Sequence, residues 1–444
     1  MNLSRVTSLV VGLIMLPLLI TGSTCVNAQT IQERLTLKEA VDIAIAADPW
    51  LAGSRYTQSA LTDEATAAAT LPDPRMSLMA SNFPVDSFDI DQEAMTQLSV
   101  GVSQMFPRGD SLALARRQKL QLALQHPLLR QDRRAKVTAT VAQIWLDAYI
   151  AQESIQLIEK DRALFEYLVD AAEASYSTAT GRARQQDVIR AQLELTRLED
   201  RLTALRQRQE TAQMRLSEWV GSPAGNGLAR VMPTESPAVP VSTSASEQER
   251  YEWVSNHPTL LALDRRIEAM ETDVDLARQK YKPEWGLSAQ YGYRDRDPMG
   301  RDRSDLLSVG VTFDLPIFTA NRQDKAVSAA ISHAESIRTD KQLLIRRLIA
   351  ELKTASVHLG RLDERYALYV DRLLPKMAEL AESSLTAYNN DAGDFAEAVR
   401  ARIAELNAKI EALAISVERQ KTIAQINYLL AQASPDSTRP VEDF

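Results

Sequence analysis

The stretch LSVGVSQMFP, residues 98–107, returns almost unchanged as LSVGVTFDLP, residues 307–316. In both copies apolar side chains alternate with small or polar ones and a proline ends the stretch, which is the pattern of a β-strand with two unlike faces. The copies lie 209 residues apart in a chain of 444 residues. A strand repeated at that distance indicates a duplicated architecture rather than one sheet domain.

The same offset of 209 residues relates Pro49 to Pro258 and Pro74 to Pro283. Further along, YSTATGRARQQDVIRAQ from Tyr176 matches YNNDAGDFAEAVRAR from Tyr388 at an offset of 212. The chain is therefore interpreted as a tandem duplication in which each copy contains a helix, a β-hairpin and two further helices. The predicted segments are a signal peptide at 1–28, a first repeat at 29–220, a linker at 221–249, a second repeat at 250–433 and a tail at 434–444.

The composition favours long helices over compact globules. Glycine is scarce at 15 residues, aromatic residues make up 6 % and charged residues 25 %. The segment 110–176 contains few helix breakers and would be roughly 100 Å long as one helix. Pro127 and Pro375 are expected to kink or break the long helices of the two halves. Coiled-coil seams are predicted at Val188, Ala191, Leu195, Leu198, Leu202, Leu205, Gln209, Ala212, Leu216 and Trp219, and at Val399, Ile403, Leu406, Ile410, Leu413, Val417, Gln420 and Ala424. An ordinary amphipathic helical bundle explains this periodicity equally well.

Charge and motifs exclude several classes of function. The formal net charge is −8 with both signs interspersed, whereas a nucleic-acid partner requires a basic patch. The sequence has no phosphate-binding glycine loop and no nucleophile motif, so neither an enzyme nor a cofactor is predicted. Its four histidines are too far apart for metal-ligand spacing, and Met76 and Met79 point to opposite faces of a strand, so no metal site is predicted either.

The N-terminus reads as an export signal. A 12-residue apolar run, residues 9–20, precedes a cleavage pattern that ends at Ala28. The competing interpretation, a membrane anchor, needs about 20 apolar residues. Cys25, the single cysteine, raises lipid attachment as a second alternative, although Thr24 before it does not fit the usual small residue there. We expect cleavage after Ala28, which leaves a mature chain without cysteine.

The predicted strands have one apolar face, and each is about nine residues long, which suits a tilted strand that crosses hydrocarbon. The alternative for one such hairpin is packing against a helix, but four strands in a duplicated, exported chain favour the membrane. Residues predicted to face lipid are Leu98, Val100, Val102, Leu287, Tyr291, Leu307, Val309 and Val311. Residues predicted to face a lumen are Ser99, Ser103, Ser288, Gln290, Ser308 and Thr312.

Four strands cannot close a barrel by themselves, because unpaired strand edges are costly in lipid. The chain is therefore expected to pool its strands with copies of itself in a symmetric oligomer, with the polar strand faces lining a shared pore.

These features resemble the TolC-like outer-membrane efflux proteins. The residues that carry the resemblance are the duplication, the strands that end in Phe106-Pro107 and LPIF at 315–318, and the two tip motifs from Tyr176 and Tyr388. LPDPRMSLMASNFP at 71–84 and LPIFTANRQ at 315–323 resemble the branch of the resistance-nodulation-division systems that serves heavy metals. The fold class is therefore mainly α with a small β part.

The resemblance implies a homotrimer in which four strands per chain build a 12-stranded barrel in outer-membrane lipid, continued by a helical tunnel through the periplasm. It implies a passive exit duct for an inner-membrane pump and a periplasmic adaptor, with heavy-metal cations as candidate cargo. A periplasmic coiled-coil scaffold or adaptor without a pore is the alternative, since it shares the helices and seams but does not need the strands.

The resemblance also places functional residues at the periplasmic tip. Two acidic positions at the entrance of the family's tunnel correspond to Glu397 and Arg400 in this chain. Glu397 is acidic as in the family, whereas Arg400 departs from the acidic pattern. Asp391 and Asp394 lie close enough in sequence to add to a ring of negative charge. The expected adaptor-docking residues are Gly181, Gly393, Tyr176 and Tyr388. Solvated tip charges and simple helix turns are the alternative readings of these positions.

Overall fold

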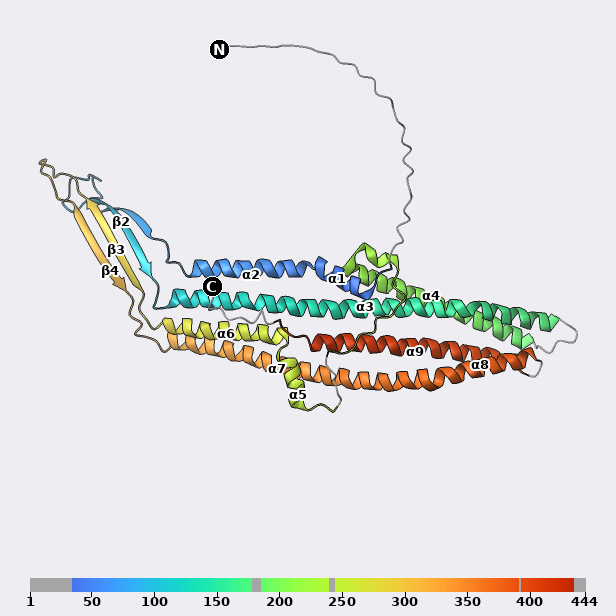
Figure 1. Ribbon diagram of the computed structural model, residues 1–444. Helices are drawn as coiled ribbons and strands as arrows, with labels where there is room; N and C mark the ends of the chain where they lie inside the picture. The colour runs from blue at the N-terminus through green and yellow to red at the C-terminus, as the bar shows by residue number, and fades with distance from the viewer. Residues whose placement is uncertain (1–33, 178–184, 239–243, 391–392, 435–444) are drawn as a thin grey trace, which may run out of the picture.

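The chain forms an elongated body with a β-sheet at one end and the ends of long helices at the other (Figure 1). The computed structural model describes residues 34–177, 185–238, 244–390 and 393–434. The predicted signal peptide, Cys25 and nearly all of the predicted tail lie outside these residues. Among the described helices, none is both long enough and apolar enough to cross a membrane.

The two halves contain matching elements in the same order. The first half comprises α1 (Leu37–Ala47), α2 (Pro49–Ala68), β1 (Arg75–Ser81), β2 (Gln97–Phe106), α3 (Ser111–Ser177), α4 (Gln185–Val220) and the short 3-10 helix η1 (Ser222–Asn226). The second half comprises α5 (Glu247–Ser255), α6 (Pro258–Gln279), β3 (Trp285–Tyr293), β4 (Leu306–Phe313), α7 (Gln323–Leu368), the π-helical turn η2 (Tyr369–Leu373), α8 (Leu374–Asn389) and α9 (Phe395–Leu429).

Each half opens with two helices, so the expectation of one opening helix was wrong. The break falls before Pro49 in the first half and before Pro258 in the second, where proline starts a new helix. The preceding residue then caps that helix: the Asp48 carboxylate accepts the Trp50 N–H at 3.0 Å, and His257 Nδ1 accepts the Thr259 N–H at 3.3 Å. The duplication therefore preserved both the break and the cap.

The strands form one antiparallel sheet in the order β1-β2-β3-β4 within the described part of the chain. The pair β2–β3 joins the two halves, with Val100 opposite Tyr291 and Phe106 opposite Trp285. The outer edges of β1 and β4 have no strand partner among the described residues. The two hairpins are thus one continuous surface that stays open on both sides.

The long arm of the first half, α3, contains 67 residues and runs without interruption through Pro127. The break expected at Pro127 does not occur, because side chains of neighbouring helices hold α3 at this level. Ser54 of α2 bonds to His126 at 3.1 Å, Thr272 of α6 bonds to Gln121 at 2.7 Å, and Leu128 is fully buried. Tertiary packing here outweighs the local cost of proline.

The corresponding arm of the second half spans residues 323–389 as α7, η2 and α8. The wide turn η2 ends just before Pro375, where a regular helix would bring the proline ring against the Asp371 carbonyl. No residue of η2 is buried. An interruption near Pro375 was expected, and a π turn is one of the known forms of such a break.

The core follows the predicted helical seams. Near the tips, Ala191, Leu198 and Leu202 of α4 pack with Ile158 of α3 and Leu406 of α9. Nearer the middle of the molecule, Trp145 of α3 is the centre of a second cluster. It stacks on Tyr149 at 5.2 Å between ring centroids and donates its indole N–H to the Leu35 carbonyl at 3.1 Å. These clusters fix the second half of α3, from about Val137 to Val169, to α4 and α9.

Candidate functional site

The sheet carries two unlike faces that extend across all four strands. Leu78, Val100, Tyr291 and Leu307 form one cross-strand row on the apolar face. Its side chains are exposed in a single chain, to 74 % for Leu307. The eight residues predicted to face lipid share this face, and the six predicted to face a lumen share the other.

The polar face is lined with glycines that leave room for the side chains of neighbouring strands. A Cβ added to Gly286 would lie 2.5 Å from Thr312 Oγ1 and 2.8 Å from Met105 Sδ. A Cβ on Gly292 would lie 2.5 Å from Gln97 Oε1. A side chain at Gly286 would have to displace Thr312 and Met105, whereas at Gly292 only the end of the Gln97 side chain would have to move.

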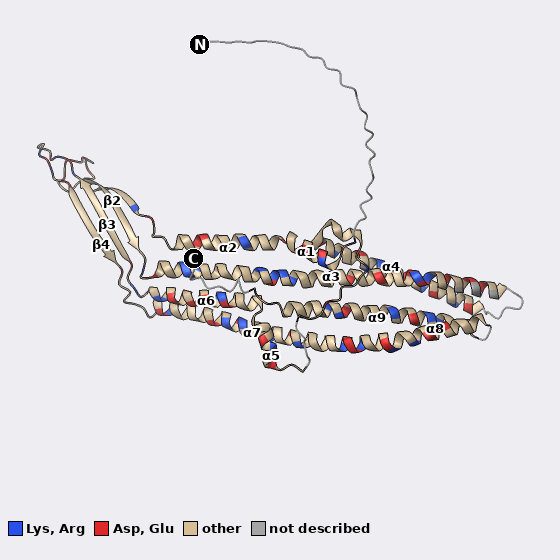
Figure 2. Cartoon of the chain, viewed as in Figure 1, with Lys and Arg blue, Asp and Glu red and all other residues tan. Residues whose placement is uncertain are grey.

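A few side chains break the division into an apolar and a polar face. Met79 lies on the polar side of the sheet, as its alternation with Met76 predicts, and so do Met105 and Leu306, whereas Gln104 lies on the apolar side opposite Leu287. Gln104 avoids an unpaired amide because its Nε2 donates to the Pro72 carbonyl at 2.7 Å. Charged residues are absent from both faces of β2, β3 and β4 (Figure 2).

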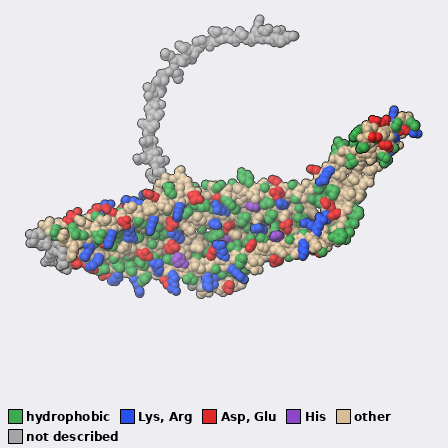
Figure 3. Space-filling view, turned by 180° about the vertical axis from the view of Figure 1, so that it is seen from behind, with side chains coloured by type: hydrophobic (Ala, Val, Ile, Leu, Met, Phe, Trp, Pro, Cys, Tyr) green, Lys and Arg blue, Asp and Glu red, His purple; other side chains and the backbone are tan. Residues whose placement is uncertain are grey.

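Apolar side chains cover much of the sheet end of the molecule, while charged side chains concentrate on the helical body and at the outermost loops (Figure 3). At the helical end of the sheet, Trp285 and Phe313 face each other at 5.0 Å between ring centroids. Aromatic residues in such a position are typical of the boundary between hydrocarbon and water.

Arg108 ties the sheet to the helices, and the sequence patterns did not identify it. Its guanidinium donates to the Lys280 and Lys282 carbonyls at 3.3 and 3.0 Å and pairs with Asp314. It thereby joins the end of β2 to the segments on either side of the second hairpin. Its position directly after the proline that ends LSVGVSQMFP could have identified it, because that position joins the strand to the following helix.

The two outer loops are held together by arginines of the charged loop 294–305. Arg303 donates to the Glu93 carbonyl at 3.0 Å and to the Asp91 carbonyl at 3.2 Å. Asp297 closes the tip of that loop: the Arg301 backbone N–H and its side chain lower the pKa of this carboxyl. The loop is therefore ordered by its own charges and braces the loop of the first hairpin.

The predicted entrance residues have local roles in the single chain. Glu397 forms an ion pair with Arg400 at 2.7 Å, one turn along α9, and both side chains are solvent-exposed. Asp394 is the N-cap of α9 and accepts the Ala396 N–H at 3.2 Å. Asp391 lies outside the described residues. The structure therefore brings Asp394, Glu397 and Arg400 together at the start of α9.

The predicted docking residues lie at the same end of the molecule. A Cβ on Gly393 would lie 2.9 Å from the Tyr388 backbone nitrogen, so the turn into α9 needs a glycine for steric reasons. Tyr388 packs edge-on against Phe395 at 5.4 Å, which makes it part of the hydrophobic cluster at the tip. Tyr176 is exposed near the end of α3, and Gly181 lies outside the described residues.

The described residues contain no group of three or more His, Cys, Asp or Glu side chains that could hold a metal ion. The described residues instead form three distinct surfaces: an apolar sheet face, a polar sheet face and a charged helical tip about 100 Å away along α3.

Comparison with known proteins agrees with this arrangement. Residues 250–432 match the sequence profile of the family described as outer membrane efflux protein. The fold of about nine-tenths of the chain is similar to that of solved outer-membrane proteins. CusC matches with a TM-score of 0.73 at 14 % identity, over 89 % of this chain and 92 % of CusC.

Two further solved structures match to a similar degree. CmeC of Campylobacter jejuni has a TM-score of 0.73 at 13 % identity, over 90 % of this chain and 87 % of CmeC. VceC of Vibrio cholerae has a TM-score of 0.71 at 14 % identity, over 89 % of this chain and 96 % of VceC. No curated protein sequence matches the chain significantly. The predicted fold class and the resemblance to outer-membrane efflux proteins are thereby confirmed.

Proposed function

We propose that the protein is an outer-membrane exit duct of a tripartite efflux system, which conducts cargo passively from an inner-membrane pump. One observation carries the proposal: a sheet with one exposed apolar face, and with two edges that have no strand partner among the described residues, sits at the end of a helical body about 100 Å long. An apolar sheet face of this kind suits lipid, and a body of this length suits the periplasm.

The open edges support a ring of copies. Edge strands in lipid need partners, so β4 of one copy pairs with β1 of the next and the contact repeats head to tail until it closes. With the trimer that the family resemblance implies, the pooled strands form a 12-stranded barrel. The face with Ser99, Ser103, Ser288, Gln290, Ser308 and Thr312 then lines the lumen, and the face with Leu98, Val100, Val102, Leu287, Tyr291, Leu307, Val309 and Val311 contacts lipid.

Paired substitutions on neighbouring residues of β4 test this assignment. Val309→Lys places a charge on the lipid-facing side, at a cost of about 2–4 kcal/mol for each copy near the bilayer centre, so the trimer should no longer be recovered from outer membranes. Ser308→Lys places the same charge in the lumen and should leave trimer recovery unchanged. Equal recovery of both variants would show that the two faces are not lipid and lumen.

The helical tip supplies the entrance and the gate. In a closed ring, copies of Glu397 and Asp394 gather around the axis and favour cations, as rings of acidic side chains do in channels. Arg400 holds Glu397 at 2.7 Å and so moderates that field. Asp391 is assigned to the same ring from its place in the sequence. This part of the proposal rests on the position of the three described residues at the start of α9.

Charge removal at the tip tests the gate. Glu397→Ala should reduce the preference for cations in planar bilayers and change the open probability. Glu364→Ala is the matched control, because it breaks a pair of the same spacing and the same 2.7 Å length, Arg361–Glu364, on α7. The gate assignment fails if Glu397→Ala and Glu364→Ala have the same conductance and the same ion selectivity.

The adaptor is proposed to meet the tips formed by Gly181, Tyr176, Gly393 and Tyr388. The close approach of Gly393 to the Tyr388 backbone gives a turn with no room for a side chain. Gly393→Leu should therefore weaken adaptor capture while the trimer still assembles. If an assembled Gly393→Leu trimer captured the adaptor as well as the wild-type trimer does, the adaptor would have to contact the protein elsewhere.

Heavy-metal cations are the narrower proposal for the cargo, supported by the resemblance of residues 71–84 and 315–323 to that branch. A deletion strain should gain sensitivity to metal salts but not to organic drugs. The reverse pattern would assign organic compounds. A signal-less protein that stays soluble and monomeric without detergent would instead support a periplasmic scaffold.

A further inference from the structure

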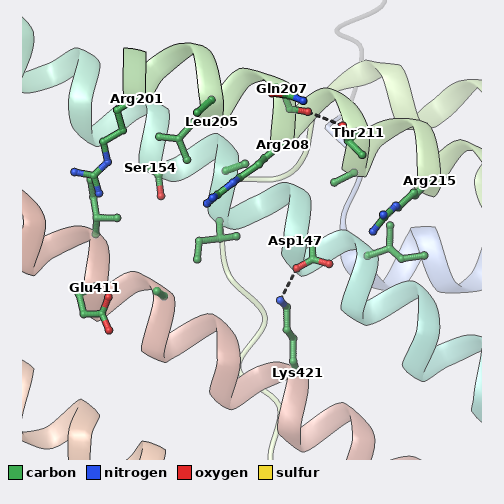
Figure 4. Close-up of a pocket in the computed structure, with 17 residues that line it drawn as sticks. Asp147, Ser154, Arg201, Leu205, Gln207, Arg208, Thr211, Arg215, Glu411 and Lys421 are labelled. Carbon is green, nitrogen blue, oxygen red and sulfur yellow. Dashed lines mark hydrogen bonds and ion pairs between the residues drawn. The ribbon is translucent and has the colours of Figure 1, made fainter. Parts of the chain in front are cut away.

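A groove of about 870 Å³ lies between α3, α4 and α9 and is separate from the sheet and the tips (Figure 4). Its floor is formed by small and branched apolar side chains. Among them are Ile144, Ile150, Leu205, Ala212, Ile410 and Ala414. Ser154 on the groove wall lies 23 residues before the end of α3, which places the groove about 35 Å from the helical tip.

Three arginines of α4 extend toward this groove in Figure 4. Arg201 donates to the neutral Asn407 side chain of α9 at 2.5 Å. Within the described residues, Arg208 and Arg215 form neither an ion pair nor a hydrogen bond, and both are exposed. The groove therefore has positive charge that the chain does not neutralise.

The acidic residues at the groove already have partners. Asp147 pairs with Lys421 across the groove, and Glu411 accepts from Arg365 of α7 at 2.9 Å. Burial and the charge of Arg208 lower the pKa of Arg201, which agrees with an excess of positive charge. An anionic occupant would relieve the mutual repulsion of these arginines.

The spacing of the arginines indicates the shape of that occupant. Arg201, Arg208 and Arg215 recur every seven residues, so they form a stripe about 21 Å long with a step of about 10.5 Å. A helix packed alongside α4 presents the same face every seven residues and matches this step. A small free anion would need only one arginine, so it would not explain the seven-residue spacing of the three arginines.

We propose that this groove binds an acidic amphipathic α-helix of a periplasmic partner, with carboxylates one heptad apart facing Arg201, Arg208 and Arg215. Small apolar side chains of that helix enter the groove between the arginines. The inference rests on the proposed function only in that it places this part of the chain in the periplasm. It adds a lateral contact well away from the tips.

A second copy of the chain fits another face of α4. Ile189, Leu193 and Met214 are exposed, and at 100° per residue they lie about a quarter turn from the arginine stripe. This apolar edge suits the contact between copies in a ring. The groove is left for a different partner, and its uncompensated charge selects an acidic one.

Labelled peptides test the proposal on the full chain in nanodiscs. The first peptide is an amphipathic helix three heptads long with one glutamate per heptad on one face. The second has the same composition with the glutamates displaced around the helix, and the third carries lysines in place of the glutamates. By fluorescence anisotropy, the first should bind at least about tenfold more tightly than the others, and added salt should weaken it.

Charge reversal locates the contact. The double variant R208E/R215E should bind the glutamate peptide about tenfold more weakly than the wild-type protein does. It should bind the lysine peptide more tightly. Lys353→Glu on α7 is the control, because Lys353 is exposed, has no ion pair among the described residues and lies away from the groove. Equal binding of the first two peptides, or equal effects of R208E/R215E and Lys353→Glu, would overturn the proposal.

Conductance separates this inference from the proposed function. R208E/R215E should form pores of wild-type conductance in planar bilayers. Normal pores without selective peptide binding would reject the groove proposal alone. Selective peptide binding by a protein that forms no pores would reject the duct and leave the groove contact standing.

Discussion

Asp48 and His257 occupy equivalent positions in the two halves and cap equivalent helices, yet their chemistry differs. Asp48 caps α2 and forms an ion pair with Arg133 at 2.7 Å, and the guanidinium lies between the rings of Trp50 and Trp219. His257 caps α6 through Nδ1, while its Nε2 donates to the Tyr428 carbonyl at 3.2 Å. Both caps are buried, with exposures of 8 % and 1 %.

The two caps titrate in different ranges of pH. Burial opposes ionisation of Asp48, but hydrogen bonds from Arg133 and from the Trp50 N–H outweigh it and lower its pKa. Burial lowers the pKa of His257, against the opposing effects of Asp132 and the Tyr428 carbonyl. The difference teaches that a duplication can keep a cap's geometry while it changes the charge that maintains it.

The arms of the two halves differ most where one is buried and the other is not. Trp145 of α3 is fully buried, whereas its counterpart at the offset of 212, Val357 of α7, is 47 % exposed. Trp145→Ala should lower the free energy of unfolding by about 3–5 kcal/mol through lost packing and a cavity. Val357→Ala should cost less than about 1 kcal/mol. Guanidinium unfolding followed by circular dichroism measures both, and similar losses would contradict the asymmetry.

Removal of the charged cap is expected to have the next largest effect. Asp48→Ala deletes an N-cap and leaves Arg133 without its carboxylate, at a cost of about 3 kcal/mol. Asp48→Asn keeps an acceptor for the Trp50 N–H and should cost less, because only the ion pair is lost. The same unfolding experiment applies. If the two variants lose equal stability, the cap bond has no part in the effect.

Acidification should affect the second half before the first. The unfolded chain binds a proton on His257 near the ordinary pKa of roughly 6.5, whereas the folded chain binds it only at lower pH. Stability is therefore fully present above about pH 6.5 and falls as the pH drops through this window. Asp48 loses its contribution only below its ordinary pKa of about 3.9.

Hydrogen exchange of the first turns of α6 and α2 measures this difference. Between about pH 7 and pH 5, protection should decrease in α6 and stay constant in α2 after correction for the intrinsic exchange rate. His257→Asn, which keeps an acceptor that does not titrate, should remove the decrease. Equal pH dependence in both helices would contradict the assignment.

The smallest expected effect concerns a position that is glycine in the first half and alanine in the second. Gly53 lies inside α2 with open space around its missing side chain, and its counterpart in α6 is Ala262. Gly53→Ala should stabilise the protein by about 0.5–1 kcal/mol, because alanine restricts the unfolded chain more. A loss of stability in thermal unfolding would show that α2 needs the glycine.

Much of the fold was predictable because it rests on periodicity. The alternation in LSVGVSQMFP and LSVGVTFDLP predicts which side chains share a sheet face, and the seam from Val188 to Trp219 predicts the contact of α4 with α3. Both are local patterns of period two and three to four. The continuity of α3 through Pro127 was not predictable, since it depends on Ser54 and Thr272 from other helices.

The site was predictable only in part for the same reason. The sheet faces follow from the pleat, but the tie from Arg108 to Asp314 spans 206 residues and needs the folded chain. The role of Asp394 as a helix cap could have been inferred from its place before α9. The groove of Arg201, Arg208 and Arg215 depends on α3, α4 and α9 together, and a seven-residue spacing of arginines alone did not reveal it.

The central claim is that copies of this chain form an open path through the outer membrane. Single-channel recording of the purified full chain in planar bilayers tests it most directly. The account predicts stepwise, ohmic conductance without any energy source, cation preference at low salt, and loss of both in the Val309→Lys variant. A protein that binds bilayers or stays in solution without any conductance steps, at concentrations where it is trimeric, would contradict it.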